Sequence, residues 1–195
     1  MTLSEAAALI RAGQVVAIPT DTVYGLAADP FQPAAVERLF RLKGRPENKP
    51  ILLLVDSRFQ VETLASRLPL AYHLITARFW PGPVTVILPA APYVPERVTA
   101  GTGTVALRMP GSILTRRLIR ACHVPLTGTS ANRSGRPPAR FAREVREQFP
   151  TTGLRVLDGG PAPRDTPSTI VDLTGEPRIV REGAVPAEAV LCCLR

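Results

Sequence analysis

The chain has 195 residues, 45% of them hydrophobic, and 24 Lys and Arg against 16 Asp and Glu give it a net charge of +8. This length and apolar content suit a full hydrophobic core that needs no disulfide or metal to fold. No apolar run reaches the roughly 18 residues of a membrane-spanning helix, and the positive charge favours an anionic partner such as a nucleotide, a nucleic acid or another phosphate.

The first predicted element is a helix near the N-terminus, where Thr2 and Glu5 have the spacing of a capping box and Gly13 can end the helix. This segment lacks the basic start and the long apolar stretch of a secretory signal. The three cysteines show neither metal-binding spacing nor a disulfide framework. We therefore expect a cytoplasmic protein with no membrane partner.

Five short apolar runs farther along the chain predict strands that are buried on both faces. They span residues 14–19, 51–55, 84–88, 104–109 and 168–173. Helical patterns lie around and between them, at residues 33–44, 57–68, 69–79, 112–123 and 141–149. Alternating strands and helices predict an α/β fold with a twisted, largely buried mixed sheet flanked by helices. No repeat or linker divides the chain, so we expect one domain over residues 1–195 and no additional C-terminal domain.

Several common site patterns are missing or stand in the wrong context. The sequence has no phosphate-binding P-loop. The stretch "GTGTVA" (101–106) leads into a predicted strand rather than into the helix that a dinucleotide fingerprint requires. His73 and His123 lie within or at the end of helical patterns without an acidic neighbour, which favours structural roles. The candidate site must therefore lie among other polar residues.

Polar residues cluster in three stretches that border apolar runs. They are "PTDTVYGLAAD" (19–29), "KGRPENKP" (43–50) and "PLTGTSANRSG" (125–135). Ligands of α/β sheets bind beyond the carboxyl ends of strands, and hydroxyl and glycine residues let backbone N–H groups approach a phosphate. The three stretches together predict the rim of a cationic pocket, whereas each one alone is ambiguous, and the first is also explained by a well-capped turn.

The second stretch holds both lysines of the chain, Lys43 and Lys49, against 22 arginines in the whole sequence. Either composition placed them there by chance, or this segment needs a compact, rotatable ammonium where a planar guanidinium would not serve.

The order and spacing of six motifs resemble the YrdC-like threonylcarbamoyl-AMP synthase family over nearly the whole chain. The motifs are "PTDTVYGLAAD", Lys43-x-Arg45 followed by "NKP", "WPGPVTVIL", "VALRMP", Ser130-x-Asn132 within "TSANRSG", and "STIVDLT" with "IVREGAV". Members combine L-threonine, bicarbonate and ATP into threonylcarbamoyl-AMP and pyrophosphate, for the threonylcarbamoyladenosine modification beside the tRNA anticodon. The resemblance implies the YrdC-like fold, a nucleotidyltransferase activity, and the downstream tRNA threonylcarbamoyl-transfer machinery as a partner.

The resemblance also implies the site residues. L-threonine would be bound by Thr22, Arg108, Gly128 and Ser168. ATP would be bound by Lys43, Arg45, Lys49, Thr104, Ser130, Asn132 and Arg181, with Lys43 and Arg45 as the catalytic residues. Mg²⁺ would be carried by ATP, without metal ligands from the protein. Leu54 stands where many relatives have a histidine, so that threonine contact is missing or replaced.

Two other functions remain open. Residues 108–146 hold nine arginines and one acid, Glu144, which would suit weak RNA binding or a double-stranded RNA or tRNA-binding module. Within this stretch Arg140, Arg143 and Arg146 have a helical spacing and would form one exposed face. An RNA-binding module explains the charge but leaves the polar stretches unexplained. The third possibility is carbamoyl transfer onto another protein, because related domains occur within the much longer hydrogenase-maturation proteins.

Overall fold

The computed structural model describes residues 1–44 and 49–194, so Arg45, one of the assigned site residues, lies outside the described residues. Helix α1 (Leu3–Arg11) begins with the predicted capping box, in which Glu5 N donates to Thr2 Oγ1 over 3.2 Å and Thr2 N donates to Glu5 Oε2 over 2.7 Å. Helix α2 (Pro33–Lys43) has proline in its first turn and ends at Gly44, whose φ of 58° suits glycine. The other helices are α3 (Arg58–Leu64), α4 (Leu70–Phe79), α5 (Glu96–Thr99), α6 (Ile113–Cys122), α7 (Ala142–Gln148), α8 (Ala187–Leu191) and the 3-10 helix η1 (Cys192–Leu194).

The strands divide between two sheets, where the sequence predicted one. The four-stranded sheet has the order β7-β2-β1-β8 and consists of β1 (Val16–Ile18), β2 (Gly25–Ala27), β7 (Thr129–Ser130) and β8 (Arg155–Val156). The six-stranded sheet has the order β10-β9-β4-β5-β3-β6 and consists of β3 (Leu52–Leu54), β4 (Val84–Pro89), β5 (Thr104–Arg108), β6 (Leu126–Thr127), β9 (Thr169–Asp172) and β10 (Arg178–Arg181). Both sheets combine parallel and antiparallel pairs, so the predicted mixed α/β fold is confirmed.

The two sheets meet where the chain passes from β6 to β7, which are edge strands of different sheets. Gly128 separates these strands, and its N–H donates to Leu52 O over 2.8 Å. Thr127 N donates to Ala28 O over 2.9 Å, and Thr127 Oγ1 donates to Leu26 O over 3.0 Å. The two bonds of Thr127 join β6 of the six-stranded sheet to β2 of the four-stranded sheet and the residue after it, and so hold the two sheets together.

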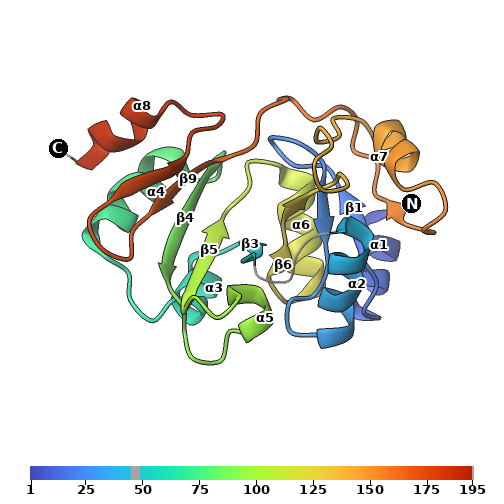
Figure 1. The fold of residues 1–195 in the computed structure, drawn as a ribbon, viewed down its shortest axis with the longest axis horizontal. Helices are drawn as coiled ribbons and strands as arrows, with labels where there is room; N and C mark the ends of the chain where they lie inside the picture. The colour runs from blue at the N-terminus through green and yellow to red at the C-terminus, as the bar shows by residue number, and fades with distance from the viewer. Residues whose placement is uncertain (45–48, 195) are drawn as a thin grey trace.

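Helices cover the sheets in two groups. Buried residues of α1 and α6 pack with Val16 and Ile18 of β1 in a smaller core, while the larger core takes in buried residues of both sheets and of helices α2, α3, α4 and α7. Figure 1 shows α4, α8 and the C-terminus at one end of the long axis, and α1, α2, α7 and the N-terminus at the other. Among residues 1–44 and 49–194, no helix has the length and apolar character that crossing a membrane requires.

Candidate active site

A cavity of about 400 Å³ lies where the two sheets meet, and both sheets contribute to its lining. The turn between β1 and β2 forms part of the wall, together with residues 128–130 and residues of β3, β4, β5, β9 and β10. Of the ten assigned site residues that the structure describes, seven line this cavity: Thr22, Lys43, Arg108, Gly128, Ser130, Ser168 and Arg181. The three polar stretches of the sequence therefore converge at one place.

The guanidinium of Arg108 ties the turn after β1 to the six-stranded sheet. Arg108 is the last residue of β5 and is only 3% exposed. Its Nη1 donates to Thr22 Oγ1 over 3.1 Å, and its Nη2 pairs with Asp21 Oδ1. Its Nε donates to Gly82 O over 3.0 Å. Thr20 Oγ1 lies 3.0 Å from Thr22 Oγ1 and extends this network.

Positive charge accumulates around Arg108. Burial lowers the pKa of the Arg108 guanidinium, the facing Asp21 carboxylate opposes that shift, and repulsion from Arg181 and Arg164 adds to the lowering. Burial also lowers the pKa of Arg181. Three guanidinium groups thus act on one small region, and Asp21 is the carboxylate that compensates Arg108. An anion that entered this region would relieve the remaining repulsion.

Ser168 and Arg181 form another part of the wall. Ser168 directly precedes β9, and Arg181 is the last residue of β10. Ser168 is 2% exposed, and its Oγ lies 2.8 Å from Thr85 Oγ1 in β4. Arg181 Nη2 donates to Ser168 O over 2.7 Å. The family resemblance assigns Arg181 to ATP and Ser168 to threonine, so this contact places residues of the two expected subsites side by side.

The ammonium of Lys43 joins the end of α2 to residues 130–132. Lys43 is 6% exposed, and its Nζ donates to Ser130 O over 2.6 Å and to Asn132 Oδ1 over 3.0 Å. The same nitrogen lies 3.3 Å from Ser130 Oγ and 3.2 Å from Asn132 O. Ser130 Oγ donates to Asn132 Oδ1 over 2.6 Å. Two motifs that are almost ninety residues apart in the sequence therefore meet at one charged group.

Leu54, at the position where the resemblance leads one to expect a histidine, packs against Gly128. A Cβ atom at residue 128 would lie 2.7 Å from Leu54 Cγ, so glycine is required there while Leu54 keeps its place. Both residues line the cavity, and Leu54 is 1% exposed. This part of the wall is therefore apolar, because the leucine side chain at position 54 cannot donate a hydrogen bond.

Three assigned residues that the structure describes lie outside the lining. Asn132 reaches the site through its contact with Lys43. Thr104 is the first residue of β5, at the opposite end of the strand from Arg108, and its Oγ1 lies 2.9 Å from Thr102 Oγ1. Lys49 is exposed. Thr104 and Lys49 thus do not line the cavity themselves, although each is within two residues of a lining residue, Ala106 and Pro50 respectively.

Three polar partners were not assigned from the sequence: Thr20, Asp21 and Thr85. Thr20 and Asp21 stand in the "PTDT" stretch beside Thr22, so their position was a usable signal. Thr85 is a fully buried polar residue in the apolar strand β4, and a hydroxyl in such a strand needs a partner. Its partner, Ser168, directly precedes the neighbouring strand β9, which the sequence alone does not pair with β4.

The expected exposed face of Arg140, Arg143 and Arg146 does not form. Helix α7 begins at Ala142, so Arg140 precedes it. Arg140 is half-buried, and its Nε has no hydrogen-bond partner, whereas Arg143 and Arg146 are exposed on the helix. The prediction of a three-arginine helical face is therefore wrong, because the helix starts later than the spacing suggested.

Neither histidine lines the candidate cavity. His73 lies within α4, and His123 ends α6 in a left-handed conformation. Within the described part of the chain, no group of three or more His, Cys, Asp or Glu side chains could hold a metal ion.

Comparisons with known proteins agree with this geometry. The Sua5/YciO/YrdC family model, which carries the description "Telomere recombination", matches residues 8–183. The threonylcarbamoyl-AMP synthase of Pyrococcus abyssi is 40% identical over 186 residues, which are 95% of this chain and 55% of that protein. The threonylcarbamoyl-AMP synthase of Thiobacillus denitrificans is 40% identical over 166 residues, which are 85% of this chain and 88% of that protein.

A solved structure is similar over nearly the whole chain. The crystal structure of Pyrococcus abyssi Sua5 complexed with L-threonine has a TM-score of 0.95 at 39% identity, and the match covers 98% of this chain and 57% of that one. The chain spans about half the length of the first curated relatives that it matches, 55% in both cases.

Proposed function

Because this chain belongs to the Sua5/YciO/YrdC family, we propose that it joins L-threonine, bicarbonate and ATP into threonylcarbamoyl-AMP and pyrophosphate. The observation that carries this proposal is the single cavity in which two clusters meet. One cluster is built on Arg108 and Thr22, and the other on Lys43 and Ser130. The similarity to a Sua5 structure with L-threonine bound supports the first cluster as the amino-acid subsite.

The reaction needs charge compensation more than it needs a nucleophilic side chain. Bicarbonate takes up a proton and loses water to give CO₂. The threonine amine then adds to CO₂ and loses a proton, which gives a carbamate. A carbamate oxygen then attacks the α-phosphorus of ATP, the bond to the bridging oxygen breaks, and pyrophosphate leaves. Both reactants are anions and repel each other in water. Holding them in line can lower the barrier by about 7–11 kcal/mol, and fixed cations stabilise the charge that develops on the phosphoryl oxygens.

The cavity offers groups for each part of this reaction. In the proposal, Thr22, Arg108, Gly128 and Ser168 bind threonine. Lys43, Ser130, Asn132 and Arg181 bind the phosphates and the nucleotide. Arg181 contacts Ser168 O and so stands between the two subsites, where the carbamate and the α-phosphate would meet. We place Arg45, Lys49 and Thr104 with the nucleotide only as an expectation from the resemblance.

The expected partners follow from the product. Threonylcarbamoyl-AMP is a mixed anhydride, so an acyl-accepting step must consume it, and the tRNA threonylcarbamoyl-transfer machinery is the proposed recipient. Mg²⁺ would arrive bound to ATP and would neutralise part of the triphosphate charge. Weak RNA binding remains a separate prediction for the exposed arginines of residues 108–146.

The first test is the requirement for all three substrates. We expect pyrophosphate release and an acid-labile adenylate only when threonine, bicarbonate and Mg·ATP are supplied together. The measurement is pyrophosphate release with threonine and bicarbonate omitted singly and together. Turnover that is equal without threonine would contradict the proposal. A protein that binds RNA with steep salt dependence and ignores threonine would point to the RNA-binding alternative.

Thr22→Val tests the amino-acid subsite. Valine keeps the shape of threonine but leaves Arg108 Nη1 without its partner at 3.1 Å, and such a loss costs about 1–3 kcal/mol. We expect weaker threonine binding and nearly unchanged ATP binding by calorimetry. Thr63→Val is the matched control, because Thr63 Oγ1 donates to Gln60 O within α3 and lies outside the cavity lining. Loss of ATP binding with intact threonine binding would reverse the assignment.

A further inference from the structure

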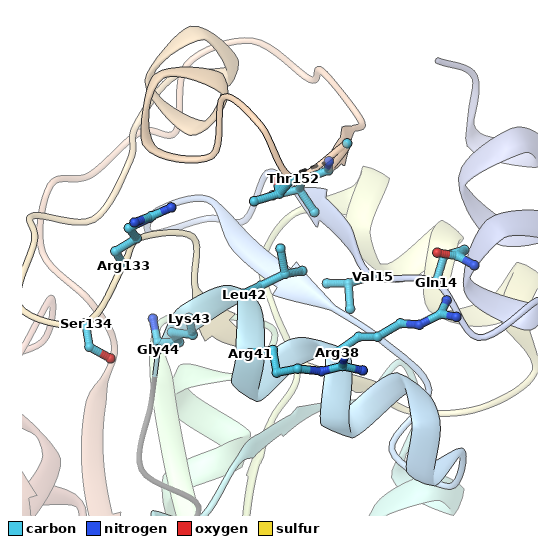
Figure 2. A pocket seen from close by; sticks show the side chains of 12 residues that line it. Gln14, Val15, Arg38, Arg41, Leu42, Lys43, Gly44, Arg133, Ser134 and Thr152 are labelled. Atoms are coloured by element: carbon cyan, nitrogen blue, oxygen red, sulfur yellow. Dashed lines mark hydrogen bonds between the residues drawn. The ribbon is translucent and has the colours of Figure 1, made fainter.

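A second, larger concave region adjoins the candidate active site at Lys43, and we call it the α2 groove. Its volume is about 800 Å³, and it is lined by residues 14–15, Arg38, 41–44, 133–134 and 152–154. Lys43 lines both this groove and the candidate active site. Figure 2 shows the end of α2 between Arg133 on one side and Arg38 and Gln14 on the other. The volume falls in the range of about 300–1,000 Å³ that is typical of small-molecule sites.

The charged side chains in the described lining of the groove are all cationic. Arg38, Arg41 and Lys43 come from α2, and Arg133 comes from the loop after β7. Basic residues in the last turn of a helix stabilise its terminal carbonyls, which accounts for two of the four. That effect does not explain Arg133, which belongs to a segment almost ninety residues farther along the chain.

Among the described residues, carboxylates compensate the charges of Arg38 and Arg41 only in part. Arg41 Nε lies 3.7 Å from Glu37 Oε1, and both side chains are largely solvated. The other oxygen of Glu37 accepts from Arg97 Nη1, so this carboxylate is shared between two arginines. Arg38 Nη1 donates to the backbone oxygen of Gly13 over 3.2 Å, which engages one of its five N–H groups, and no carboxylate in the described part of the chain forms an ion pair with it.

The rest of the lining suits the non-ionic parts of a nucleotide. Val15, Leu42 and Leu154 give an apolar surface, and Ser134 and Thr152 add hydroxyl groups. Gly44 and Gly153 have φ angles of 58° and 67°, and a Cβ at either would meet no atom within 4 Å. The backbone at these two glycines is thus open to close approach by a ligand.

We propose that the α2 groove is a second anion site, which binds a nucleotide through its phosphate. Arg133 would contact the phosphate from one side and Arg38 or Arg41 from the other, while the base would lie on the apolar surface. The nucleotide is either free in solution or part of an RNA strand, and both share this chemistry. The proposal does not depend on the adenylate-forming activity, because Arg133, Arg38 and Arg41, which would contact the phosphate, do not line the candidate active site.

The test is a titration of the isotope-labelled protein, followed by the backbone amide resonances of Thr152 and Gly153. ADP should shift these resonances. It should also shift the resonance of Gly128, which marks the candidate active site, with a dissociation constant of its own. Arg133→Glu should raise the dissociation constant read at Thr152 and Gly153 by about tenfold or more, and leave the constant read at Gly128 unchanged. Arg41→Gln should act in the same direction. Arg143→Glu is the matched control, since Arg143 is an exposed arginine of α7 outside the groove.

A second titration with a short single-stranded RNA distinguishes the two sources of the nucleotide. RNA binding at Thr152 and Gly153 that is at least about tenfold tighter than ADP binding assigns the groove to an RNA strand. Equal or tighter binding of ADP assigns it to a free nucleotide. The proposal is overturned if neither ligand shifts these resonances at millimolar concentration. It is also overturned if Arg133→Glu raises the dissociation constant read at Thr152 and Gly153 no more than the Arg143→Glu control does. Far-ultraviolet circular dichroism verifies that each variant is folded.

Discussion

Replacing Lys43 with arginine is expected to lower kcat/KM for pyrophosphate release by at least ~10-fold, or about 1.4 kcal/mol of transition-state stabilisation. The Lys43 ammonium is enclosed by oxygens of Ser130 and Asn132 at 2.6–3.3 Å. A guanidinium is larger and planar, so it cannot occupy the same space or direct its protons to the same oxygens. Lys43→Ala should be worse, because it removes the charge and the link between α2 and residues 130–132.

Arg143→Lys is the control for this prediction. It exchanges the same two cationic groups at an exposed position of α7, outside the cavity lining, and should leave kcat/KM unchanged. The measurement is steady-state pyrophosphate release, after circular dichroism shows that each variant is folded. If Lys43→Arg keeps the wild-type kcat/KM, the site needs only positive charge at residue 43, and the pairing of the two lysines in one segment is an accident of composition.

The regular elements of this fold could be predicted because their signals are local. The capping box of α1, the proline and glycine of α2, and the apolar runs of β4 and β5 all lie within a few residues of the structure that they specify. The division into two sheets could not be predicted in this way. It depends on β6 and β7, which have two residues each, and on partners that lie 72 to 105 residues away in the sequence. Strands this short carry no periodic pattern.

The same distinction applies to the candidate site. The polar stretches showed which segments carry Thr22, Lys43 and Ser130, and the structure brings these residues to one cavity. The contact between Ser168 and Thr85 could not be predicted from the sequence, because it depends on which strands become neighbours in the sheet. Spacing alone misled at Arg140, since a helical period says nothing about where the helix begins.

The second large effect is expected at Arg108, where Arg108→Met should lower the free energy of unfolding by about 3–5 kcal/mol, because it breaks a buried ion pair. The guanidinium is buried and pairs with Asp21 Oδ1, whose other oxygen is already buried without a hydrogen-bond partner. Removing the arginine would leave the carboxylate without its compensating charge. Threonine-dependent turnover should fall as well, since Thr22 loses the same partner. Urea unfolding gives the stability, and pyrophosphate release gives the activity.

A double variant separates the buried charge from lost packing. Adding Asp21→Asn to Arg108→Met removes the uncompensated carboxylate and should restore about 0.5–3 kcal/mol of the lost stability, because residues in direct contact have interaction energies of this size. The control is Arg58→Met, which breaks the exposed pair between Arg58 and Glu62 at 2.8 Å. A pair of this kind, four residues apart on a helix surface, contributes only about 0.3–0.5 kcal/mol. If Arg108→Met costs no more than Arg58→Met, or if Asp21→Asn restores nothing, then Arg108 does not hold the turn after β1 through its charge.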